Sequence, residues 1–160
     1  SLAHYYLLQR RAVGLVTASR QFRVIPAERS DRQEGKILET LAFIETESEL
    51  SIAGLVAAQA GQLPQGSSAI LVTPTVHPEL LAAVDDLQRR NLRPVVVLLI
   101  ANSFGGSIGG EKLYNSLFER SVPVCRIYCG ADLSFELSGF SSVMTSQDTS
   151  WKRPTLSHLT

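Results

Sequence analysis

Residues 67–100, SSAILVTPTVHPELLAAVDDLQRRNLRPVVVLLI, contain two apolar runs separated by one amphipathic segment. The runs 67–73 and 94–100 are nearly continuous in apolar or small residues, which is typical of strands buried on both faces. Between them, His77 and Pro78 stand where the cap and first turn of a helix are expected. The predicted core face of this helix is Leu80, Leu81, Val84 and Leu87. The order strand, helix, strand predicts parallel pairing, because parallel neighbours need a crossover connection.

The same alternation extends toward the amino terminus. Residues 12–19 (AVGLVTAS) predict another buried strand, and residues 22–25 an edge strand that Pro26 ends. Asp31 and Glu34 have the spacing of a capping box at the start of an amphipathic helix. Helical spacing of apolar residues marks a first helix before residue 10 (Leu2, Tyr5, Tyr6, Leu8), the capped helix (Ile37, Leu38, Leu41, Ile44) and a third helix (Leu50, Ile52, Leu55, Val56, Ala60).

Toward the carboxyl terminus, a glycine-rich loop precedes a helix with Leu113, Tyr114, Leu117 and Phe118, and residues 124–129 predict a half-exposed edge strand. Residues 138–160 form a Ser/Thr-rich tail with weak patterning. We therefore expect an α/β fold with one doubly wound, mostly parallel sheet and helices on both faces, over residues 1–137.

Composition narrows the function classes. The chain has 160 residues, 44% of them hydrophobic, and its 15 Lys and Arg balance 15 Asp and Glu. A nucleic-acid-binding domain normally has a basic excess, so nucleic acid is not expected as a partner. No apolar run approaches the roughly 18 residues that span a bilayer, and the start at Ser1 without a signal-peptide pattern indicates a fragment.

The two cysteines, Cys125 and Cys129, are four residues apart in one predicted strand. At the usual rise per residue they lie about 13 Å from each other, too far for a disulfide. They are interpreted as reduced core thiols, which favours a reducing, cytoplasmic location, with membrane tethering through segments outside this sequence as the alternative.

Four segments carry a resemblance to a known family: SLAHYYLLQRRAVGLVTAS, FRVIPAERSDRQEGKILETLAFIE, SSAILVTPT with the helix after it, and LQRRNLRPVVVLLI. Their order and wording over residues 1–137 resemble a von Willebrand factor A-like (Rossmann-like) domain of the family called domain of unknown function fifty-eight. The resemblance implies that the first strand of that fold is missing. It also implies a protein-interaction module without catalysis or cofactor, working with a MoxR-type AAA+ ATPase.

The resemblance implies a divalent-metal position at the carboxyl ends of the strands, and this sequence fills it poorly. The threonine of the family pattern falls near Ser48, and its late aspartate falls on Pro74, between Thr73 and Thr75. Proline has no side-chain oxygen to offer a hard cation. We expect no bound metal.

The missing first strand would lie between residues 12–19 and residues 67–73 in the family's strand order. Strand edges that face such a gap recruit another chain unless they pair with each other. This predicts a homo-oligomer, with a dimer favoured, in contact through either strand or through the tail around Trp151.

One catalytic alternative stays open. Gly105, Ser107 and Gly109 form a G-x-S-x-G between a strand and a helix, and Asp132 and His158 follow in the order of an α/β-hydrolase. A small serine hydrolase is therefore the second hypothesis, although residues 101–104 separate the strand from the turn. The glycine loop lacks the spacing of a phosphate-binding loop, and His4 and His77 have no companion at metal-ligand spacing.

Overall fold

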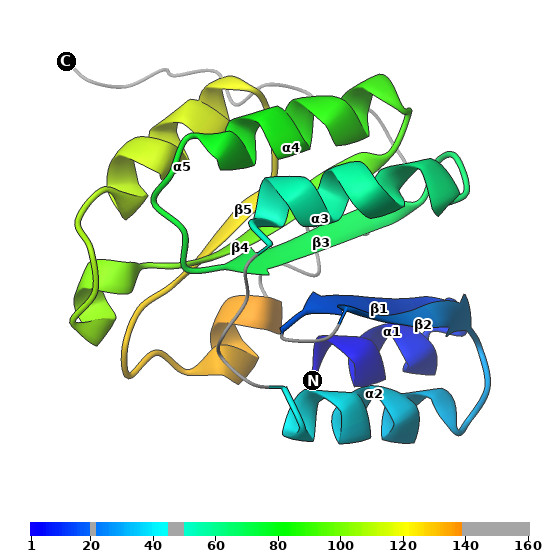
Figure 1. Ribbon diagram of the computed structural model, residues 1–160. Coiled ribbons are helices and arrows are strands. Elements are labelled where there is room, and N and C mark those ends of the chain that lie inside the picture. The colour runs from blue at the N-terminus through cyan, green and yellow to red at the C-terminus, as the bar shows by residue number, and fades with distance from the viewer. Residues whose placement is uncertain (20–21, 45–49, 139–160) are drawn as a thin grey trace, which may run out of the picture. The chain divides into compact units, whose positions relative to one another are not determined.

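The computed structural model describes residues 1–19, 22–44 and 50–138 (Figure 1). It has a two-stranded sheet and a three-stranded sheet, both accompanied by helices. The chain divides into two compact units, Ser1–Leu71 with His77–Pro94, and Val72–Val76 with the described residues from Val95 on. No described helix is long and apolar enough to cross a membrane. Ser48, Trp151, His158 and almost all of the predicted tail lie outside the described residues.

The first two strands form a sheet of their own. β1 (Val13–Ala18) pairs antiparallel with β2 (Phe22–Glu28), and neither strand joins the parallel sheet. The expectation of one sheet was wrong here, because the connection from Ala18 to Phe22 is far shorter than the dozen or more residues of a parallel crossover. β1 is also only half-buried, since a two-stranded sheet gives it a neighbour on one side alone.

Pro26 does not end β2, in contrast to the prediction. It lies inside the strand at a register shift, where the pairing passes from Val13 and Glu28 to Leu15 and Ile25. Proline is tolerated at such a bulge on an edge strand, where its missing N–H breaks no ladder. Opposite this bulge a Cβ on Gly14 would lie 2.7 Å from the carbonyl oxygen of Ile25, so only glycine fits.

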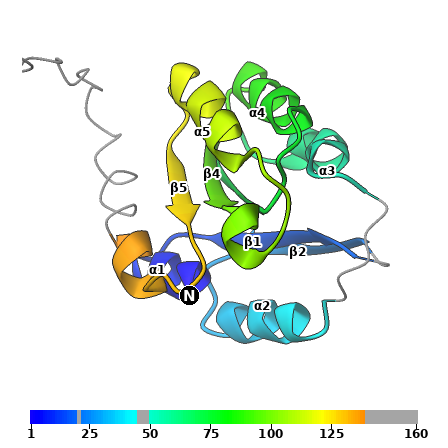
Figure 2. The same cartoon turned by 90° about the vertical axis from the view of Figure 1, so that its left-hand side faces the viewer.

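Two helices, α1 (Leu2–Leu8) and α2 (Gln33–Ala42), pack against each other and against this sheet (Figures 1 and 2). The predicted capping box is absent, because α2 is capped at Arg32 without a side-chain hydrogen bond. Ile37 is buried as expected, whereas Leu38, Leu41 and Ile44 are exposed.

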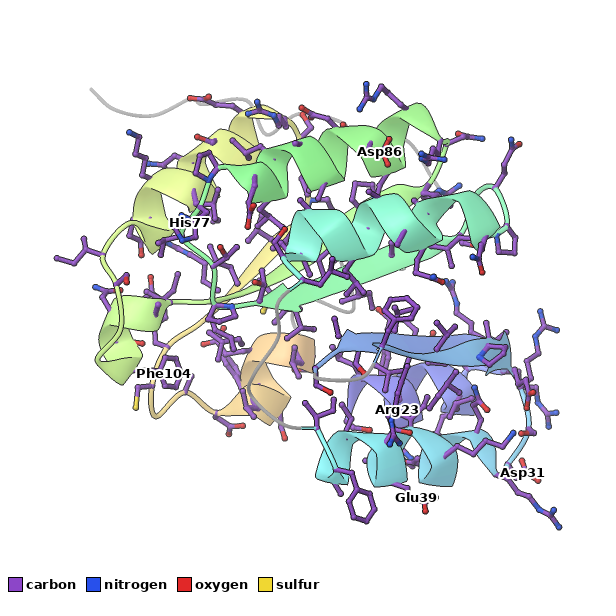
Figure 3. All side chains as sticks on the ribbon, viewed as in Figure 1. Arg23, Asp31, Glu39, His77, Asp86 and Phe104 are labelled. Atoms are coloured by element: carbon purple, nitrogen blue, oxygen red, sulfur yellow. The ribbon has the colours of Figure 1, made fainter. Side chains whose placement is uncertain are left out.

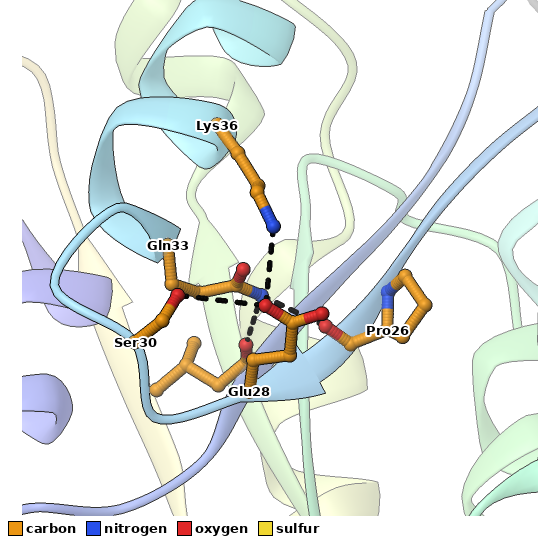
Figure 4. Close-up of polar contacts among 6 residues, drawn as sticks. Pro26, Glu28, Ser30, Gln33 and Lys36 are labelled. Atoms are coloured by element: carbon orange, nitrogen blue, oxygen red, sulfur yellow. Dashed lines mark hydrogen bonds and ion pairs between the residues drawn. The ribbon is translucent and has the colours of Figure 1, made fainter.

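Gln33 instead attaches the start of α2 to the sheet. It is fully buried, and its Nε2 donates hydrogen bonds to the carbonyl oxygens of Val13 (2.7 Å) and Pro26 (2.8 Å) (Figure 4). Beside it on the surface, the Glu28 carboxylate accepts from Lys36 Nζ at 3.1 Å and from Ser30 Oγ at 3.4 Å.

The first unit continues with α3 (Ile52–Gln59), the short 3-10 helix η1 (Ala60–Gln62) and α4 (Glu79–Arg89). The Ser51 side chain caps α3 by accepting from the N–H of Gly54, and α3 packs on α4. α4 begins one residue later than predicted, with Pro78 rather than His77 at its N-cap. The buried residues of α4 are Leu80, Ala83, Val84 and Leu87; Leu81 is half-buried.

The second sheet has the order β3 (Ser68–Thr73), β4 (Arg93–Leu99), β5 (Val124–Ile127). β4 and β5 run parallel and side by side, with Val96 opposite Val124 and Leu99 opposite Ile127 (Figure 2). β4 is buried from Pro94 to Leu98, as its apolar sequence predicts, and α5 (Gly110–Glu119) packs on β5. Within α5, Leu113 and Leu117 are buried, whereas Phe118 is exposed.

Candidate functional site

The segments that follow the parallel strands belong to the second unit. They are residues 73–76 from the last residue of β3, residues 100–110 from the end of β4 to the first residue of α5, and residues 128–135 after β5. Ligands of open α/β sheets bind outside the carboxyl ends of the strands. We call these three segments the carboxyl edge, and the predicted site residues that the structure describes lie on it.

At the end of β3, the Thr73 side chain turns back on the backbone that follows it. Thr73 is 5% exposed, and its Oγ1 accepts a hydrogen bond from the N–H of Thr75 at 3.1 Å. Pro74 between them is exposed and has no side-chain oxygen. Over the described ranges 1–19, 22–44 and 50–138, no group of three or more His, Cys, Asp or Glu side chains is placed to hold a metal ion.

The 3-10 helix η2 (Ala101–Phe104) follows β4, and one of its side chains contacts the segment after β5. Ser103 Oγ donates to the carbonyl oxygen of Ile100 at 2.8 Å and accepts from the N–H of Cys129 at 2.9 Å. The hydroxyl therefore fixes the segment after β5 to the segment after β4. Neither the apolar patterning nor the motif search indicated Ser103, because its role depends on which strand lies beside β4.

The glycine loop serves close packing. Gly109 has φ +136° and lies against Val76, where an added Cβ would be 3.3 Å from the valine Cβ. Gly110 lies equally close to Ile100. Gly109 and Gly110 are needed because the backbone approaches a side chain at each of them. Gly105, the other glycine of the G-x-S-x-G, has nothing within 4 Å of an added Cβ, and its φ of +82° gives η2 a left-handed C-cap.

Ser107 lies in this loop, exposed and outside any helix or strand. A nucleophile elbow places its serine on a strained turn directly between strand and helix. Here η2 and the glycines separate β4 from α5, and Ser107 is not among the described non-glycine residues with positive φ. The geometry of an elbow is therefore missing at Ser107.

Asp132 is used as a helix cap. Its Oδ1 accepts hydrogen bonds from the N–H groups of Ser134 (2.9 Å) and Phe135 (3.2 Å), at the start of the helical segment 133–138. Capping by a carboxylate stabilises a helix start. In the described part of the chain, no hydrogen bond joins Asp132 to Ser107. His158 lies outside the described residues.

The two cysteines differ in environment. Both are free; Cys125 is buried in β5, whereas Cys129 follows the strand and is exposed. Burial raises the pKa of the Cys125 thiol, and the nearby Glu136 adds to this effect. The prediction of two core thiols was wrong for Cys129, because β5 ends at Ile127.

A polar and aromatic cluster joins α5 to β5. The Glu111 carboxylate accepts from Tyr128 Oη at 2.5 Å and from Arg126 Nη1 at 3.0 Å. The Arg126 guanidinium lies 4.2 Å from the ring centroid of Tyr114. Glu111 and Tyr114 are three apart on the helix, and Arg126 on β5 and Tyr128 just after it are two apart, so the spacing of these residues was a usable signal in the sequence.

Exposed apolar side chains are the last feature of the carboxyl edge. After β4, Phe104 is 53% and Ile108 87% exposed; after β5, Leu133 is 56% and Phe135 75% exposed. Figure 3 shows Phe104 on η2. Single exposed apolar residues are ordinary, but several on adjoining segments are less common.

Comparison of the chain with protein-family models, with curated proteins and with solved structures finds no match in any of the three.

Proposed function

We propose that this chain is a non-catalytic protein-interaction module that binds its partner through the carboxyl edge. The exposed side chains of Phe104 and Ile108 after β4, and of Leu133 and Phe135 in the helical segment after β5, carry the proposal. Aromatic and aliphatic anchors of this kind supply most of the energy of protein interfaces. The hydrogen bond between Ser103 and Cys129 holds the two loops together, so the surface is organised before binding.

The polar groups of the same edge support binding rather than catalysis. The Thr73 hydroxyl, the Ser103 hydroxyl and the Asp132 carboxylate each accept hydrogen bonds from backbone N–H groups of the chain itself. A catalytic base or nucleophile needs a hydrogen-bonded companion that prepares it for reaction. These three groups have backbone partners instead, and their role is to fix loops.

For the fold we propose a von Willebrand factor A-like arrangement without its first strand. Along the chain, two strands and two helices precede strands that alternate with helices, which is the segment order on which the resemblance rests. For the partner we propose a MoxR-type AAA+ ATPase, the partner implied by the resemblance to the domain of unknown function fifty-eight family.

Replacement of Phe135 tests the proposed surface. We expect Phe135→Ser to weaken binding to a purified MoxR-type ATPase by about 2 kcal/mol, roughly thirtyfold in Kd by biolayer interferometry. Phe118→Ser is the matched control, because Phe118 is similarly exposed, at 65%, but lies on α5. Equal losses in both variants would contradict the surface, and binding absent in the unaltered chain would contradict the partner.

A further inference from the structure

The four outer edges of the two sheets differ in how well they are protected from pairing with another chain. Proteins protect exposed edges with charged residues, proline, bulges or short strands. β2 contains Arg23, Glu28 and Pro26 at its bulge, and β5 has four residues with Arg126 among them. The edges of β2 and β5 are therefore protected.

The remaining two edges belong to β1 and β3, and neither strand contains a charged residue or proline. β3 has the larger apolar surface beside its edge, because its Val72 is 55% exposed, whereas β1 has no large apolar side chain of comparable exposure. Moreover, the chain has no Asp, Glu, Lys, Arg or His anywhere from Leu50 to Val76. The edge of β3 can thus face a copy of itself without bringing like charges together.

The backbone direction of β3 shows which groups the edge presents. The Ser67 carbonyl oxygen accepts a hydrogen bond from the Arg93 N–H at 2.9 Å, so residue 67 faces the β4 side. Because backbone groups alternate between the two sides of a strand, Ile70 and Val72 direct their N–H and C=O groups to the open edge. Such groups are a template for a further strand.

We propose that β3 pairs with β3 of a second copy of this chain, antiparallel and about a two-fold axis, so that two three-stranded sheets become one continuous sheet. This inference is independent of the carboxyl-edge proposal, since it uses the edge of β3 and not the loops after the strands. The sequence predicted a contact through β1, through β3 or through the tail around Trp151, and the proposal names β3.

The test measures self-association of the full chain by light scattering and sedimentation over a dilution series. We expect the mass to rise from the monomer value of 17.4 kDa toward twice that value at high micromolar concentration. The amides of Ile70 and Val72 should exchange hydrogen more slowly as the concentration rises. A monomer throughout the series would overturn the proposal.

Two substitutions at one position locate the contact. Val72→Lys places a charge beside the pairing edge, and Val72→Pro removes an outward N–H while leaving the β4 side of the strand intact. Each should raise the dimer dissociation constant at least tenfold, with the circular dichroism of the folded chain retained. The controls are Val24→Lys, at another exposed valine, and Trp151→Ser. Loss of the dimer in a control, or its persistence in both Val72 variants with unchanged affinity, would overturn the assignment to β3.

Discussion

Gln33 Nε2 lies 2.8 Å from the carbonyl oxygen of Pro26, and this side-chain hydrogen bond connects α2 to the bulge of β2. The same nitrogen serves Val13, so one fully buried amide satisfies a carbonyl on each strand of the antiparallel pair. Part-buried carbonyl groups without a donor reduce stability, and Gln33 supplies a donor to one such carbonyl on each strand at the bulge. Gln33 therefore compensates for the irregularity that Pro26 introduces.

Removing this amide should destabilise the fold. We expect Gln33→Leu, which keeps the approximate volume, to lower the free energy of unfolding by about 1–2 kcal/mol, because two part-buried acceptors lose their donor. Urea denaturation followed by circular dichroism gives the value. Gln88→Leu, at an exposed position of α4, should change it by less than about 0.5 kcal/mol. A similar value for both variants would show that the two hydrogen bonds contribute little.

Two glycines should respond to alanine in opposite directions. Gly109→Ala forces a side chain into a left-handed conformation against Val76, and we expect it to cost about 1 kcal/mol or more. Gly35 lies within α2 with nothing within 4 Å of an added Cβ, so Gly35→Ala should stabilise by about 0.5–1 kcal/mol. Thermal melting of the two variants beside the unaltered chain shows whether each substitution raises or lowers the melting temperature. A higher melting temperature for Gly109→Ala would refute the packing role of Gly109.

The elements predicted well are those whose signal is local. β4 is buried along most of its length because its sequence is apolar at successive positions, and α4 buries three of its four predicted core residues because their spacing is helical. Pairing is not a local property. The sequence of β1 is as apolar as that of a central strand, yet its partner is decided by the short connection to β2.

The candidate site shows the same division. Pro74 and the glycine loop were visible in the sequence, and the absence of a carboxylate at Pro74 followed directly. The roles of Ser103 and Asp132 depend on hydrogen bonds to backbone groups, one of them 26 residues away along the chain. Residue type alone left Asp132 as a catalytic candidate, whereas its position before residues 133–138 makes it a cap.

The contact between Glu111 and Tyr128 should appear in the titration of the tyrosine. The hydrogen bond to Glu111 raises the pKa of Tyr128, and the same hydrogen bond lowers the pKa of the Glu111 carboxyl. Glu111→Gln should therefore move the pKa of Tyr128 down toward its ordinary value, measured from the pH dependence of its ring resonances by NMR. Glu119→Gln on the same helix is the control and should leave the titration unchanged.

The sign of the linked stability change follows from these directions. The pKa of Tyr128 is raised on folding, so this tyrosine adds to the free energy of unfolding. That added stability is complete below the pKa of the unfolded state and is lost as the pH rises through the pKa of the folded state. The pKa of Glu111 is lowered on folding, so this carboxylate also adds to the free energy of unfolding. That added stability is present above the pKa of the unfolded state and is lost as the pH falls through the pKa of the folded state. Both groups lie near the surface, so the change in melting temperature at either pH extreme should be small.

Divalent cations should not stabilise this chain. A ligand that binds the folded state raises its melting temperature, and hard cations need several oxygen ligands at one place. Within the described part of the chain no such acidic cluster occurs, and Pro74 lacks the oxygen that the family pattern supplies. We expect the same melting temperature with Mg²⁺, with Ca²⁺ and with EDTA. An increase that EDTA reverses would contradict this expectation.

Ser107 should be inert toward a fluorophosphonate probe. Such a probe reacts with a serine whose hydroxyl is activated by a neighbouring base, and an oxyanion site must stabilise the adduct. Ser107 lies on an exposed loop without the strained turn of a nucleophile elbow, and Asp132 is engaged with the N–H groups of residues 134 and 135. Intact-mass spectrometry after incubation should show the unmodified chain, with a known serine hydrolase labelled in parallel as the positive control. Labelling that disappears in Ser107→Ala and is also lost in His158→Ala would support the hydrolase hypothesis and end the proposal of a binding-only module.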